Sequence, residues 1–113
     1  MERDGCRKAV EFIRRETGLE VEVIRDGGPV WSDAADPLMA RLTDVMRKTW
    51  NDPKLAFATM SGATDARHFG GLGLPVAIVG SESGGAHTDD EWADIGGLER
   101  LRTALATFLG ERD

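Results

Sequence analysis

His87 is the residue of this chain best suited to chemistry at a metal ion. It stands in the segment GGAHTDDE, residues 84–91, where only small residues precede the histidine. A neutral imidazole on such a loop can reach a metal, and zinc is its usual partner. The acidic residues that follow suit both metal binding and helix capping. A surface histidine in a polar loop is the competing interpretation, because catalytic zinc needs about three protein ligands and adjacent carboxylates do not converge easily.

A second candidate site is the turn SGATD, residues 61–65, which lies between an apolar run and a short helical pattern. Backbone N–H groups from Gly62 to Thr64 could hold an anion or a developing oxyanion, with the Thr64 hydroxyl as a further donor. Arg67 could clamp a carboxylate through two parallel hydrogen bonds. The alternatives are helix N-capping by Thr64 and Asp65, and an ion pair between Asp65 and Arg67.

No residues for nucleophilic catalysis are evident, and no catalytic residue is assigned. Neither Ser61 nor Cys6 has a histidine at a readable spacing. The Gly-Gly pairs match no phosphate-binding loop. His68, the other histidine, has no assignable task.

Helical patterns must position these loops. Residues 3–17 are typical of an amphipathic helix, and Gly18 stands where a C-terminal cap belongs. A second helix is expected over 36–50, where an Asp-Pro start leads into helical apolar spacing. Residues 64–69 fit one short helical stretch. An apolar stripe over 98–109 predicts the last helix.

Three segments between the helices have strand patterns. Residues 19–23 alternate between apolar and acidic side chains, 55–60 form a short mixed run, and 75–79 are wholly apolar. Helices and strands thus alternate along the chain, which predicts an α/β fold. The composition break at 27–36 is the one plausible boundary between structural units.

Composition excludes several classes of function. A formal charge of -6 argues against nucleic-acid binding, which needs clustered Lys and Arg. No apolar run approaches the roughly 18 residues that span a membrane, so no membrane partner is expected. The single cysteine, Cys6, permits no internal disulfide, which makes the cytoplasm the expected compartment.

The ordered motifs of the second half resemble the co-catalytic zinc amidohydrolases and peptidases. That family includes acetylornithine deacetylase, succinyl-diaminopimelate desuccinylase, aminoacylase and glutamate carboxypeptidase. The resemblance covers residues 54–110 and rests on SGATDAR at 61–67, GLP at 73–75 and HTDDEW at 87–92. Ala63 replaces a glycine common in the family's turn. Residues 5–50 more loosely resemble half of the family's inserted lid domain.

The resemblance implies a fold and a set of roles. The fold would be a partial zinc-peptidase-like α/β sheet of C-terminal strands and helices, plus half of a ferredoxin-like lid domain. Residues 1–50 would be the second half of this lid, and residues 51–113 the C-terminal part of the catalytic domain. His87 would be the last protein ligand of one of two zinc ions. Gly62, Thr64 and Arg67 would line the substrate side.

The resemblance also implies what is missing. The family's earlier half carries a His-x-Asp ligand pair, a bridging Asp and a Glu-Glu pair that includes the general base. No histidine precedes Ser61 in this chain. We therefore expect a fragment of a hydrolase of N-acyl amino acids or small peptides, inactive alone. The alternative is a stand-alone binding or assembly module, a possible homo-oligomer. A single-zinc site between subunits is a third interpretation, for which nothing specifies further ligands.

Overall fold

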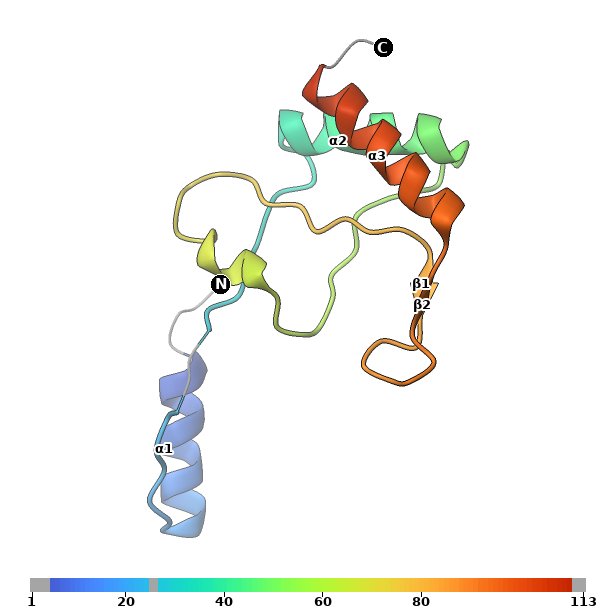
Figure 1. Ribbon diagram of the computed structural model, residues 1–113. Helices are drawn as coiled ribbons and strands as arrows, with labels where there is room; N and C mark the ends of the chain where they lie inside the picture. Colours follow the sequence, from blue (N-terminus) through green and yellow to red (C-terminus); the bar gives the residue numbers. More distant parts are fainter. Residues whose placement is uncertain (1–4, 25–26, 111–113) are drawn as a thin grey trace. The chain divides into compact units, whose positions relative to one another are not determined.

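The structure is a computed structural model that describes residues 5–24 and 27–110 (Figure 1). Its elements, in chain order, are α1 (Gly5–Thr17), α2 (Pro37–Trp50), the 3-10 helix η1 (Asp65–His68), β1 (Ser83–Gly84), β2 (Trp92–Ala93) and α3 (Ile95–Leu109). The chain divides into two compact units, Met1–Trp31 with Gly62–Leu74, and Ser32–Ser61 with Pro75–Asp113. None of the described helices is long and apolar enough to cross a membrane.

The predicted helices are confirmed, together with the local signals that end them. Gly18 ends α1 with a φ of +68° and donates its N–H to the carbonyl of Arg14 at 2.9 Å. Glycine favours this left-handed conformation because it has no Cβ. Residues 3 and 4 of the expected first helix lie outside the described residues.

Helix α2 begins and ends as its sequence predicts. Asp36 is the N-cap, and its carboxylate accepts the N–H of Leu38 at 2.9 Å. Pro37 occupies the first turn, where its missing N–H leaves no hydrogen bond unmade. Asn51 ends the helix in the left-handed conformation, with φ 51° and ψ 40°.

The core of the second unit lies where α2 packs on α3, the pair seen side by side in Figure 1. Leu42 and Met46 of α2 meet Ala104 of α3, which is completely buried. Arg41 adds a polar link, since its guanidinium lies 4.8 Å from the Phe108 ring and donates to the Phe108 carbonyl. Half-buried side chains from the two helices and from the segments 55–57 and 77–79 complete the cluster: Val45, Trp50, Leu55, Phe57, Ala77, Val79 and Phe108.

The three predicted strands are wrong as strands. Within the described residues, the sheet consists of β1 and β2 alone, and 19–23, 55–60 and 75–79 form no ladder. A strand forms only when its backbone groups bond to those of a neighbouring strand. In these segments, side chains bind some of the backbone groups instead. Arg47 Nε donates to the Leu55 carbonyl at 2.8 Å. The helices and the small antiparallel sheet remain compatible with an α/β fold, whereas the lid detail is not confirmed.

The exposure of side chains nevertheless alternates along two of these segments. Leu55 and Phe57 are half-buried around an exposed Ala56, and Ala77 and Val79 flank an exposed Ile78. The inward residues of both segments pack against the core of the second unit. The wholly apolar run at 75–79 predicts a strand covered on both faces, and this prediction is wrong, because Ile78 is 47% exposed.

Candidate functional site

A short hairpin in the second unit carries His87. Strands β1 and β2 pair antiparallel, with Gly84 opposite Trp92. Figure 1 shows the intervening loop, residues 85–91, projecting from the end of the hairpin that is remote from α3. The side chain of His87 is exposed on this loop.

Two hydrogen-bonded turns shape the loop. Thr88 donates both its backbone N–H and its Oγ1 hydroxyl to the Gly85 carbonyl, at 3.0 and 2.7 Å. Glu91 then donates its N–H to the Thr88 carbonyl at 3.3 Å. His87 lies inside the first turn, so its backbone direction is set by the Thr88 contacts.

The loop has a left-handed backbone at two positions. His87 has a φ of 65°, and Gly85 has a φ of 66°. A left-handed conformation costs a non-glycine residue roughly 1–2 kcal/mol and recurs at functional sites. Gly85 is required for a further reason, because an added Cβ would lie 2.8 Å from the Asp90 carbonyl oxygen.

The acidic residues beside His87 do not converge on it. Asp89, Asp90 and Glu91 are all exposed. Among the described residues, no ion pair joins their carboxylates to the imidazole. The loop therefore presents one histidine rather than a preformed cluster of ligands.

The turn before η1 belongs to the first unit. Gly62 has a φ of +136°, which suits glycine, and Thr64 is extended at the N-cap position of η1. The Thr64 side chain makes no capping hydrogen bond, so the helix-capping alternative is not supported for this residue. The ligand-binding role expected of its hydroxyl stays a prediction.

Arg67 is bound to the backbone of this turn. Its backbone N–H and its NH1 group both donate to the Thr64 carbonyl, at 3.2 and 3.4 Å. No ion pair between Asp65 and Arg67 occurs within the described part of the chain. Gly62, Thr64 and Arg67 thus lie in one compact unit, and His87 lies in the other.

One family model matches nearly the whole chain. It is that of peptidase family M20/M25/M40, and it matches residues 5–111. The chain belongs to peptidase family M20/M25/M40. A search of curated proteins and a search of solved structures gave no match. The family predicted from the motifs at 61–67, 73–75 and 87–92 is therefore confirmed.

Proteins of the M20/M25/M40 family generally use zinc, but the described residues do not make a complete zinc site. Within 5–24 and 27–110, no three His, Cys, Asp or Glu side chains are grouped so that they could hold a metal ion. Zinc in catalytic sites takes about three protein ligands. His87 could supply one of them, so no metal-dependent step can be derived from this donor set.

A polar network in the second unit of this M20/M25/M40 chain has no local signal in the sequence. Glu82, just before β1, accepts the indole N–H of Trp50 at 2.8 Å and an Arg100 NH2 group at 3.1 Å. The pKa of Glu82 is lowered, first by a hydrogen bond from its own backbone N–H and then by one from Trp50. Desolvation opposes this shift, and Arg100 lowers the pKa further. These partners are 32 and 18 residues away, beyond any local pattern.

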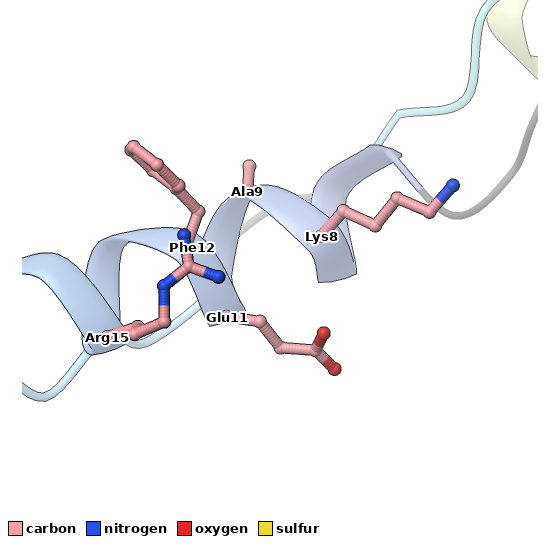
Figure 2. A pocket seen from close by; sticks show the side chains of 5 residues that line it. All are labelled: Lys8, Ala9, Glu11, Phe12 and Arg15. Atoms are coloured by element: carbon pink, nitrogen blue, oxygen red, sulfur yellow. The ribbon is translucent and has the colours of Figure 1, made fainter.

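A hollow on α1 is unrelated to the predicted site residues. It is lined by Lys8, Ala9, Glu11, Phe12 and Arg15. Figure 2 shows that all five side chains come from this single helix. The Arg15 guanidinium carbon lies 5.4 Å from the Phe12 ring centre, an ordinary cation–π contact. The hollow is part of an exposed helix surface.

Proposed function

We propose that this chain contributes one metal-ligand histidine and a substrate-side turn to a metal-dependent hydrolase of amide bonds. The bonds would be those of N-acyl amino acids or small peptides. The observation that carries the proposal is the loop of His87, in which a left-handed histidine precedes the Thr88 turn on a defined hairpin. Membership of peptidase family M20/M25/M40 supports the reaction class.

The role proposed for His87 is that of a metal ligand. Its imidazole is exposed, and the residues before it are glycine and alanine, so a metal could approach without displacing a side chain. The tight Thr88 turn limits how far the backbone of His87 can move. A ligand fixed in advance loses little conformational entropy when it binds.

The turn of Gly62 and Thr64, with Arg67, is proposed as the substrate side. The Thr64 hydroxyl is not used as a helix cap, which leaves it available to a ligand. Arg67 lies half-buried with its guanidinium at the turn carbonyl, and a fork of N–H donors suits a substrate carboxylate. Contact with substrate makes these residues binding residues, not catalytic ones.

We further propose that the chain is inactive alone. The general base and the remaining ligands would come from protein outside the described residues, because those residues hold no group of three metal-ligating side chains. Two zinc ions would be bound in the complete site. The compartment proposed is the cytoplasm, on the basis of the single cysteine.

The nucleotide sequence upstream of the Met1 codon tests this origin. An in-frame coding stretch with a His-x-Asp pair and a later Glu-Glu pair is expected under the proposal. A stop codon in frame directly before Met1, without those pairs on any neighbouring reading frame, would contradict it.

A second function is favoured by the apolar surface. Phe12 and Ile13 of α1 are 56% and 41% exposed, and Trp31 is 74% exposed. Such residues could serve a stand-alone assembly module that self-associates. Light scattering distinguishes the two: a stable monomer that binds no hydrophobic dye would contradict the assembly role.

A further inference from the structure

Three elements of the second unit meet at the side chain of Glu82. One carboxylate oxygen, Oε1, accepts from the indole of Trp50 at 2.8 Å and from Arg100 at 3.1 Å. Trp50 is the last residue of α2, and Arg100 is in α3. The Glu82 carbonyl also accepts the N–H of Asp94 at 2.8 Å, which extends the pairing of the hairpin by one step. A single residue thus joins both long helices to the base of the hairpin.

Asp94 completes the network from the other strand. It is the N-cap of α3, and its Oδ2 accepts the N–H of Gly97 at 2.6 Å. The same oxygen lies 3.4 Å from an Arg100 NH2 group. The Arg100 guanidinium therefore bridges Glu82, which precedes β1, and Asp94, which follows β2, at the base of the hairpin.

In the first turn of α3, the Glu82 carboxylate occupies the space beside Gly97 that a side chain would fill. A Cβ added at Gly97, which is buried, would collide with Glu82 Oε2 and would lie 3.1 Å from Ser81 Cβ and 3.3 Å from Asp94 Oδ2. A Cβ added at Gly96 would meet Asp94 Oδ2 at 3.2 Å and Arg100 NH1 at 3.6 Å, and nothing closer. The two neighbouring glycines therefore differ in their relation to Glu82.

The hairpin is too short to fix its own direction. Each strand has two residues, and an isolated two-stranded hairpin is marginally stable in water. The direction in which the loop of His87 projects must then depend on side chains at the hairpin base. The network of Trp50, Glu82, Asp94 and Arg100 supplies such contacts.

We propose that Glu82 is a positioning residue for His87, which acts by holding the hairpin base against Trp50 and Arg100. The proposal rests on the role of His87 given above. Glu82 touches neither metal nor substrate in this account. Its effect reaches His87 through the two strands and the turn of Gly85 and Thr88.

The matched variants Gly97→Ala and Gly96→Ala test the proposal in the full chain. Both replace a glycine in the first turn of α3 by a better helix former, so their effects on helix propensity are alike. Nuclear magnetic resonance would follow the indole N–H of Trp50, the imidazole of His87 and the loop amides. The indole N–H of Trp31, in the other unit, serves as an internal reference.

In Gly97→Ala, the displaced carboxylate should shift the Trp50 indole signal, the His87 imidazole signal and the amides of 85–91. In Gly96→Ala, these signals should stay close to those of the parent chain. Glu82→Gln, which keeps an acceptor for Trp50, should retain more of the parent loop signals than Glu82→Ala. The glutamate variants also give a result if Gly97→Ala fails to fold.

Movement of the Trp50 signal without any change at His87 and the loop amides would overturn the proposal, because Glu82 would then be purely structural. Equal effects of Gly97→Ala and Gly96→Ala would also overturn it. None of these signals depends on bound metal or turnover. A failure of the metal-ligand role of His87, seen as identical metal binding by parent and His87→Ala chains, is therefore distinguishable from a failure of this proposal.

Discussion

Gly84 lies directly under the indole of Trp92, across the hairpin that carries the candidate site. A Cβ added at Gly84 would lie 2.7 Å from Trp92 Nε1 and 2.9 Å from its Cε2. The ring thus covers the one position of β1 that has no side chain. Trp92 is the last residue of the HTDDEW motif, so this contact packs the end of the motif against the opposite strand, β1.

Replacement of Gly84 by alanine should destabilise the second unit by about 1–3 kcal/mol, because the new methyl group overpacks the indole. Urea denaturation followed by tryptophan fluorescence measures this. Gly80→Ala is the control, since a Cβ there meets nothing within 4 Å. An equal loss in both variants would show that the indole contact is not the cause.

Replacement of Asp94 by alanine should cost about 1 kcal/mol, because the N-cap of α3 loses its acceptor for the Gly97 N–H. The change in the urea midpoint measures it. Asp89→Ala, at an exposed loop position, should leave the midpoint nearly unchanged. If Asp94→Ala is as stable as the parent chain, the Asp94 cap does not contribute to stability.

Leu42→Ala should destabilise the second unit by about 2–5 kcal/mol, because the side chain is buried against Ala104 and the core there is small. Circular dichroism should show a loss of helical signal at lower temperature than in the parent chain. Leu38→Ala is the control on the same helix, where the side chain is 50% exposed. Similar losses for both variants would contradict the proposed core.

The stability of the second unit should depend on the ionisation of Glu82. Its pKa in the folded chain is lowered from the ordinary value of 4.5, first by its own backbone N–H and then by Trp50. A lowered folded pKa stabilises the fold above the unfolded pKa, and this contribution is lost as the pH falls through the folded value. The urea midpoints of the parent and Glu82→Gln should therefore converge under acid conditions. A constant difference between the two urea midpoints at every pH, acid conditions included, would contradict the contribution of ionised Glu82 to stability.

The helices could be predicted from the sequence because their signals are local. Asp36 and Pro37 start α2, Gly18 ends α1, and each acts on backbone groups within one turn. These features need no knowledge of distant residues.

The strands and the polar network could not be predicted because they depend on distant partners. Residues 75–79 have a strand pattern, yet Val76 exchanges both its hydrogen bonds with the Ser32 hydroxyl, 44 residues earlier. Nothing in the residues next to Glu82 distinguishes it from other loop carboxylates, because its partners Trp50 and Arg100 are distant in the sequence. The motif around His87 identified the family, while its turn geometry came from the structure.

Zinc content and hydrolysis, measured together on the pure 113-residue chain, test the central claim most directly. The proposal predicts less than one zinc ion per chain by atomic emission and no hydrolysis of N-acetyl amino acids. Stoichiometric zinc with turnover, both lost in His87→Ala, would contradict the claim that this chain supplies only part of a metal site.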